Sequence, residues 1–175
     1  MPMSERKGNE IRQKKKQIVE LTLNQVIYLA GIVDGEGALM ITRKRMKNYK
    51  STIYPHEEYF ALIPIIQISN TNNDLIDILL SWGFHETGSQ QRPKGKLVRV
   101  VIVSRLNDLK KLLEWIQPFL IVKKEQAKIL KAFVDSRLQK YWSYGCRRKY
   151  TLEEIQYRNS IKILNLRGKH DASIS

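Results

Sequence analysis

Apolar positions along the chain switch between helical and strand-like spacing, in an order that predicts the architecture. Helical spacing begins after Thr22, where the sequence T-L-N-Q indicates a capping box with Gln25. It ends where Gly35 and Gly37 interrupt the chain. Strand-like segments then come in pairs, and a further apolar helix follows each pair. The expected elements are a helix at 22–35, strands at 38–45 and 59–69, a helix at 72–83, strands at 87–92 and 97–104, and helices at 106–117, 123–138 and 151–166.

This order, αββαββα followed by extra C-terminal helices, predicts an α+β fold. Two hairpins joined by a helix make a four-stranded antiparallel sheet with helices on one face. Pro64, inside the second strand, indicates a bulge or incomplete pairing there. We expect residues 1–21 to form a basic flexible arm and residues 22–175 to form a single domain.

The charge balance indicates which class of partner the chain binds. Lys and Arg number 31 against 17 acids, for a net charge of +14, which favours nucleic acid over other partners. A solvated basic surface without chemistry is the alternative. No apolar run approaches the ~20 residues of a membrane span, and the polar N-terminus lacks a signal-peptide segment. The single Cys146 and scattered histidines exclude a zinc centre, so we expect an intracellular, reducing location, either prokaryotic cytoplasm or an organelle, and no secretion.

The sheet face opposite the helices is the candidate nucleic-acid surface. Alternate residues of strand 38–45 include Thr42 and Lys44, and the hairpin around Gly95 adds a tight group of basic residues. A polar, basic sheet of this kind lies readily in a major groove, although an ordinary solvated face remains the alternative. The hairpin residues in question are Gln90, Arg92, Lys94 and Arg99.

The segment LAGIVDGEG (29–37) carries the candidate chemistry. Gly31 and Gly35 lie four residues apart on one helical face, so they allow close approach of a second copy; packing under the sheet is the alternative. Glu36 follows the helix, where a carboxylate opposes the helix dipole unless a cation binds there. Mg²⁺ is satisfied by one or two carboxylates plus water and phosphate. From spacing alone, a metal site and an exposed acidic turn explain Glu36 equally well.

LAGIVDGEG resembles the signature of the LAGLIDADG homing endonucleases, in their one-motif, homodimeric branch. IQISN (66–70) and QPFLIVKKEQA (117–127) resemble two further segments of that family, and the similarity covers about residues 22–138. The stretch LKAFVDSRL (130–138) lacks the glycines and second acid of the motif, so we interpret it as a core helix. One motif per chain implies a homodimer.

The resemblance implies specific roles. Glu36 would bind Mg²⁺ or Mn²⁺ with the Gly35 carbonyl, Asn70 would place the attacking water, and Lys123 would stabilise charge on the phosphate. Asp74 stands near the position of a basic residue in the family, a departure from its pattern. The motif helix would form the dimer interface through residues Leu29, Ala30, Gly31, Val33 and Asp34.

The implied activity is cleavage of both strands of a long, nearly palindromic double-stranded DNA site, leaving short 3′ overhangs. The sheet would read bases through Gln67 and the face residues named above, while Arg167 and Lys169 would contact phosphates. Two alternatives remain open: an intron maturase that binds RNA, and an inactive DNA-binding regulator of the same fold.

Overall fold

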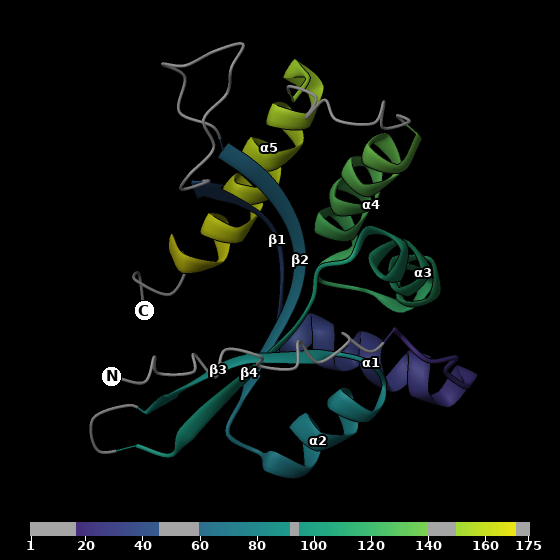
Figure 1. The fold of residues 1–175 in the computed structure, drawn as a ribbon, viewed down its shortest axis with the longest axis vertical. Coiled ribbons are helices and arrows are strands. Elements are labelled where there is room, and N and C mark those ends of the chain that lie inside the picture. The colour runs from purple at the N-terminus through teal and green to yellow at the C-terminus, as the bar shows by residue number, and fades with distance from the viewer. Residues whose placement is uncertain (1–16, 46–59, 92–94, 140–149, 171–175) are drawn as a thin grey trace, which may run out of the picture.

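A computed structural model describes residues 17–45, 60–91, 95–139 and 150–170 of the chain. The predicted order of elements is confirmed, with ends that shift by a few residues (Figure 1). The elements are α1 (Leu23–Glu36), β1 (Gly37–Arg45), β2 (Phe60–Asn70), α2 (Asn73–Ser81), β3 (His85–Gln91), β4 (Leu97–Val103), α3 (Leu106–Ile116), the short 3₁₀ helix η1 (Gln117–Phe119), α4 (Lys124–Gln139) and α5 (Leu152–His170).

The four strands form one antiparallel sheet in the order β1-β2-β4-β3, as two hairpins joined through β2 and β4. The register pairs Leu39 with Ile66 and Ile66 with Val103. Pro64 pairs with Ile41 of β1 without a register shift, so the expected bulge is absent there. On the other edge β4 begins to pair only at Ile66, so β2 lacks a second partner strand at Pro64, and the incomplete pairing that the sequence indicated is confirmed.

Alternation along the strands places the core on one side of the sheet. Leu39, Ile66 and Val101 are at most 1% exposed on this side; α1, α3 and α4 pack against the β1–β2 part of the sheet, and α2 packs against β4. The helices contribute fully buried side chains such as Leu29, Leu112 and Phe133 to the same cluster. Truncation of a side chain like Phe133 to alanine typically costs about 3–5 kcal/mol. This core makes the sheet and α1 one rigid support for whatever lies at the end of α1.

The segment before α1 is docked, contrary to the predicted arm boundary at residue 21. Ile18 is 6% exposed within the core cluster, and the Val19 N–H donates to the Trp82 carbonyl at 3.1 Å. Gly83 permits this approach: its φ is +101°, and a Cβ there would lie 2.3 Å from the Gln17 carbonyl oxygen. Residues 1–16 lie outside the described part.

Helix α5 is fixed beside the edge strand β1. Its start is capped by a reciprocal pair, in which the Thr151 N–H donates to Glu154 and the Glu154 N–H donates to Thr151. The Asn165 amide donates to the Leu39 carbonyl of β1 at 2.9 Å, and Ile161 is 1% exposed. The helix continues past Gly168 to His170, beyond its expected end. None of the helices in the described residues is long and apolar enough to cross a membrane.

Candidate active site at the end of α1

Helix α1 ends in a tightly closed turn. Glu36 is its last residue, not a residue beyond it as the sequence indicated, and the Gly37 N–H donates to the Ile32 and Val33 carbonyls. A Cβ on Gly37 would lie 2.8 Å from both the Cα and the carbonyl oxygen of Val33. Glycine at this position therefore lets the helix pass directly into β1. These contacts fix the backbone of the turn, and the Glu36 side chain that it carries is exposed.

Asp34 and Lys123 join the end of α1 to the start of α4 by reciprocal hydrogen bonds. The backbone N–H groups of Ile121, Val122 and Lys123 donate to the Asp34 carboxylate at 2.6, 3.3 and 2.9 Å. In return, Lys123 Nζ donates to the Val33 and Asp34 carbonyl oxygens at 2.8 and 2.7 Å. An ammonium has three donors, so one N–H of Lys123 remains for another acceptor.

The titration of these two groups follows from the same contacts. Burial opposes ionisation of Asp34, but the three backbone N–H groups and the nearby Lys123 charge outweigh it and lower the pKa of Asp34. Burial lowers the pKa of Lys123, against the attraction of Asp34. Asp34 was predicted to lie in a dimer interface; the structure instead gives its carboxylate to the chain's own backbone.

The structure brings Glu36 and Asn70 into contact, although they are 34 residues apart. The Asn70 amide donates to a Glu36 carboxylate oxygen, and the Asn70 side-chain oxygen accepts the Asn72 N–H at 2.7 Å. These two bonds fix the orientation of the Asn70 amide beside the carboxylate. Glu36, Asn70 and Lys123, the three predicted catalytic residues, therefore gather around the C-terminal turn of α1.

The donor set at this turn fits a hard divalent cation, but only in part. The described residues hold no group of three His, Cys, Asp or Glu side chains. Glu36 is one carboxylate, and the last helical carbonyls, including that of Gly35, have run out of intrahelical donors. Mg²⁺ accepts such a sparse set when water and phosphate oxygens complete its shell. The turn is thus suited to a metal that arrives together with a phosphodiester.

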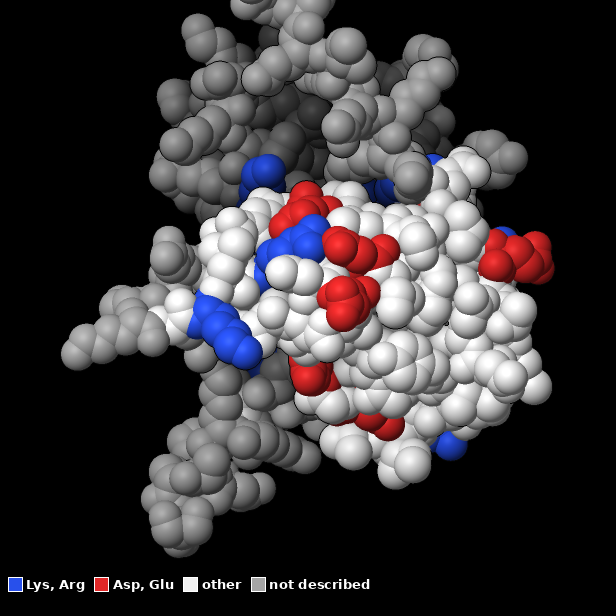
Figure 2. Space-filling view, turned by 90° about the horizontal axis from the view of Figure 1, so that it is seen from below, with Lys and Arg blue, Asp and Glu red and all other residues white. Residues whose placement is uncertain are grey.

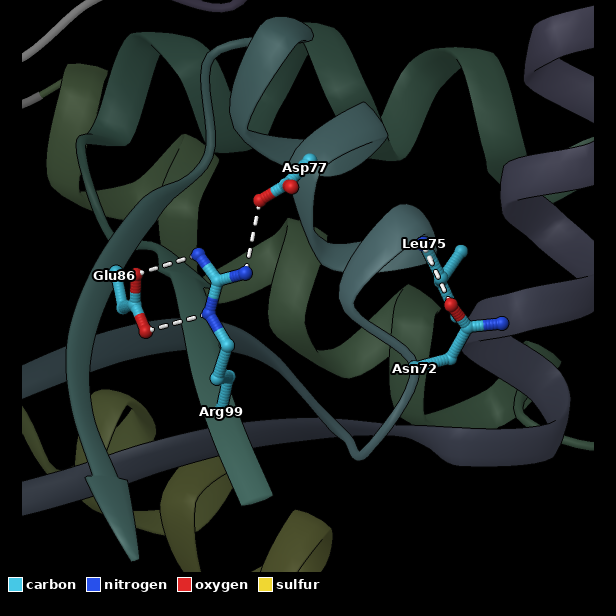
Figure 3. Close-up of polar contacts among 5 residues, drawn as sticks. All are labelled: Asn72, Leu75, Asp77, Glu86 and Arg99. Atoms are coloured by element: carbon cyan, nitrogen blue, oxygen red, sulfur yellow. Dashed lines mark hydrogen bonds and ion pairs between the residues drawn. The ribbon is translucent and has the colours of Figure 1, made fainter. Parts of the chain in front are cut away.

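Arg99 was predicted to read DNA, and the structure contradicts this. Its strand position pairs with Asn70 and shares the helix side of the sheet with Val101, so its side chain turns toward α2 (Figure 3). The guanidinium donates two bonds to Glu86 at 3.0 Å and one to Asp77 at 2.8 Å. The Arg99 hydrogen bonds lower the pKa of Glu86 and raise that of Arg99. Strand parity, counted from the core residue Val101, was the signal that the sequence offered.

Helix α2 starts beside this cluster, and its cap explains the acid at position 74. The Asn72 side chain accepts the Leu75 N–H at 3.3 Å and caps the helix (Figure 3). Asp74 lies in the first turn of α2, where a carboxylate interacts favourably with the helix dipole. The departure from the family pattern therefore has a local structural role.

The other residues predicted to contact DNA, through bases or phosphates, fall into two groups. Thr42 and Lys44 lie on the sheet side opposite the core, where they pair with Ile63 and Ala61, and Gln67 shares that side. Gln67 donates to Ser69, and Thr42 donates to the Ile63 carbonyl. The second group lies outside the described side chains and comprises Gln90, Arg92, Lys94, Arg167 and Lys169.

The exposed face of α1 shares only Gly31 with the predicted dimer residues. Leu29, Ala30 and Val33 are at most 1% exposed and belong to the chain's own core, so they are not available to a second chain. The exposed residues, which we call the α1 face, are Leu23, Ile27, Tyr28, Gly31 and Gly35. Helical spacing counted from the buried positions would have found this face in the sequence.

The α1 face is apolar and poor in cations. Leu23 is 63% and Ile27 45% exposed, and a hollow of about 330 Å³ between α1 and α2 extends from Tyr28 to Glu36. Neither α1 nor α2 contains a Lys or Arg, although the chain carries +14. Viewed from the α2 side, this part of the molecule is mostly uncharged, with carboxylates more prominent than cations over its centre (Figure 2).

A second hollow, which we call the β1–α5 groove, begins at Gly37 on the other side of the same turn. It measures about 600 Å³ and is bordered by Arg43 of β1, Lys123, and Arg158 and Lys162 of α5. Its floor includes Met40, Ile41 and Ile161. Sequence reasoning missed Arg158 and Lys162; their i,i+4 spacing beside the buried Ile161 was the available signal.

Comparison with known proteins places this site in a recognised architecture. No family model matches the sequence, and no curated protein matches it. Among solved structures, the archaeal intron-encoded homing endonuclease I-Vdi141I, complexed with DNA, matches with a TM-score of 0.53 and 17% identity over 82% of this chain and 98% of that one. The chain has the fold of the LAGLIDADG homing endonucleases.

Two further LAGLIDADG-fold structures define the extent of the match. The homing endonuclease I-CvuI, in complex with its target, gives a TM-score of 0.50 at 18% identity, covering 82% of this chain and 96% of that chain. The LAGLIDADG homing endonuclease I-SmaMI, bound to cleaved DNA, gives 0.55 at 16% identity, covering 83% of this chain but 44% of that chain. This chain therefore corresponds to nearly all of I-Vdi141I and I-CvuI and to less than half of I-SmaMI.

Proposed function

We propose that this chain is a site-specific DNA endonuclease that acts as a homodimer and needs a divalent metal ion. The observation that carries the proposal is the convergence of Glu36, Asn70 and Lys123 at the end of α1, within a fold shared with DNA-bound homing endonucleases. The high positive charge supports a polyanionic substrate. The match to nearly all of I-Vdi141I supports one cutting site per chain, and hence two chains for two strands.

The residues divide the work of phosphodiester hydrolysis among them. Glu36 and the Gly35 carbonyl would hold Mg²⁺ or Mn²⁺, which polarises the phosphate and lowers the pKa of bound water. Asn70 already donates to Glu36, so its amide fixes the carboxylate and the geometry of water beside it. The third N–H of Lys123 would donate to the phosphate, whose negative charge rises in the transition state.

The test uses a randomised duplex library incubated with the purified protein and Mg²⁺, followed by sequencing of newly formed ends. We expect ends with short 3′ overhangs, centred on a near-palindrome. The variant Glu36→Gln should lower cutting by at least about 10³-fold while it retains DNA binding, because it removes the metal-binding charge and leaves the fold intact.

Two results would contradict the proposal. Cutting by Glu36→Gln at the wild-type rate would remove Glu36 from the site. An absence of new ends, combined with tight retention of structured RNA or of uncut DNA, would instead favour an intron maturase or a DNA-binding regulator.

A further inference from the structure

The cations of the β1–α5 groove differ from most other described cations in their partners. Lys110 on α3 forms an ion pair with Asp135. On α4, Lys128 pairs with Glu125, and Lys131 pairs with both Glu114 and Asp135. Within the described part of the chain, no carboxylate lies within salt-bridge distance of Arg43, Arg158 or Lys162. The positive charge of the groove is therefore left available to an external anion.

The groove holds its cations in place. The Arg43 guanidinium lies 3.4 Å from the centroid of the Phe60 ring, which orients it. Arg158 donates only to the neutral side chain of Asn159, at 3.4 Å, and its Nε is buried with no acceptor among the described residues. A buried donor without a partner is destabilising unless a ligand or water satisfies the group. Arg158 thus has unused hydrogen-bonding capacity at this site.

The lining of the groove suits a polyanion whose anionic groups alternate with sugar carbons. Its floor is largely apolar, with Met40 and Ile161, and its border is cationic. Arg158 and Lys162 are separated by about 6 Å of helical rise, so they can contact successive anionic groups along one strand. At the near end, Lys123 belongs both to the groove and to the turn that holds Glu36.

We propose that the β1–α5 groove binds the DNA backbone next to the cutting site, with Arg43, Arg158 and Lys162 contacting its phosphates and the apolar floor contacting deoxyribose carbons. This inference rests on the proposed function. It extends the phosphate contacts expected of Arg167 and Lys169 to two further residues of α5, Arg158 and Lys162, which position the strand without a role in base recognition.

The experiment measures binding of a random-sequence duplex of about 30 base pairs by fluorescence anisotropy over a series of salt concentrations. Each neutralised phosphate contributes about 0.9 to the slope of log K against log salt. The double variant Arg158→Gln/Lys162→Gln should therefore lower the slope by about 2 per protomer, and weaken binding at least about 10-fold near 0.1 M salt.

Two controls separate local contact from total charge. Lys110→Gln/Lys128→Gln removes the same charge from α3 and α4, and we expect a change below about 2-fold, because distant surface charges are screened. Arg158→Lys/Lys162→Arg keeps the groove charge and should keep the salt slope. All variants are compared at equal folded fraction, verified by circular dichroism.

The outcomes distinguish this inference from the function on which it rests. A groove variant whose slope equals that of the Lys110/Lys128 control would overturn the groove assignment, even if the wild-type protein cuts DNA. A lower slope in the groove variant, together with a wild-type protein that binds DNA but fails to cut it, would support the groove and contradict the nuclease. Preferential retention of an RNA hairpin, lost in the groove variant, would overturn duplex DNA as the occupant.

Discussion

Two surfaces meet at the C-terminal turn of α1, and they differ in charge. The α1 face exposes Leu23, Ile27 and Tyr28, and no Lys or Arg occurs in α1 or α2. The β1–α5 groove has an apolar floor but a border of four cations. Cations are thus absent from the helices on one side of the turn and border the groove on the other.

The difference follows from what each surface is suited to bury. Association of two proteins removes surface groups from water, and unpaired charges in such a contact carry a large desolvation cost. Binding a polyanion gains from counterion release at every cation that meets a phosphate. An apolar face and a cationic groove on either side of Glu36 therefore match a protein contact and a nucleic-acid contact.

The variant Ile27→Asp, which places a carboxylate in the α1 face, should have the largest effect on pairing of two chains. Ile27 is 45% exposed, so the chain should still fold, whereas a buried unpaired carboxylate would raise the dimer dissociation constant at least about 100-fold. Sedimentation velocity measures the change, and cutting of both strands should be lost with it. Ile163→Asp on α5, where Ile163 is 53% exposed, is the matched control and should leave the mass unchanged. Equal behaviour of the two variants would show that the α1 face does not pair chains.

The next effect tests the junction that joins the two surfaces. Asp34→Asn replaces a charged acceptor of three N–H groups and should lower the free energy of unfolding by about 1–3 kcal/mol near pH 7. The lowered pKa of Asp34 means that its stabilisation is present above the unfolded value near 4 and is lost as pH falls through the folded value. Urea unfolding should show the variant approaching wild type below about pH 4. A difference independent of pH would exclude the carboxylate charge as its cause.

Two glycines of the LAGIVDGEG segment, Gly37 and Gly31, differ in the atoms that surround them. A Cβ on Gly37 meets the Val33 backbone, so Gly37→Ala should cost about 1–3 kcal/mol of folding free energy. A Cβ on Gly31 meets nothing within 4 Å, so Gly31→Ala should keep or raise stability, while it weakens pairing through the α1 face. Thermal unfolding and sedimentation, measured on both variants, separate the two effects. Destabilisation of the single chain by Gly31→Ala would contradict the assignment of that glycine to an exposed face.

The smallest effect concerns a cation that belongs to neither surface. Arg99→Gln removes the ion pairs with Glu86 and Asp77, so the urea midpoint should fall slightly. Base preference in the selected DNA sites should not change, because Arg99 lies on the helix side of the sheet. A shift in selected bases at one position would return Arg99 to the reading surface.

The sequence predicted the fold well because local sequence patterns determine where each helix and strand lies. The cap at Thr22 and the changes between helical and strand-like spacing located the elements, and the element order dictated the sheet. Side-chain direction was less accessible. Arg99 and the α1 residues Leu29, Ala30 and Val33 were assigned to surfaces by type or motif, whereas core packing decides which way each one points.

The sequence indicated the residues of the candidate site but not the hydrogen bonds that join them to the rest of the chain. Glu36, Asn70 and Lys123 were identified through resemblance, and they do gather at one turn. The bonds of Asp34 to the start of α4 depend on contacts across 87 to 89 residues, which no local pattern encodes. The β1–α5 groove arises from the docking of α5 on an edge strand, and this docking also lies beyond local sequence.

The most direct test of this account is the mass of the complex on the duplex that the library selection returns. The Glu36→Gln chain in Mg²⁺ keeps the DNA uncut, and sedimentation at micromolar concentration then counts chains of 20.5 kDa on each duplex. Two chains per duplex, reduced to one or none by Ile27→Asp, is the predicted result. One chain per duplex for both proteins would contradict the claim that the α1 face pairs two copies over a single DNA site.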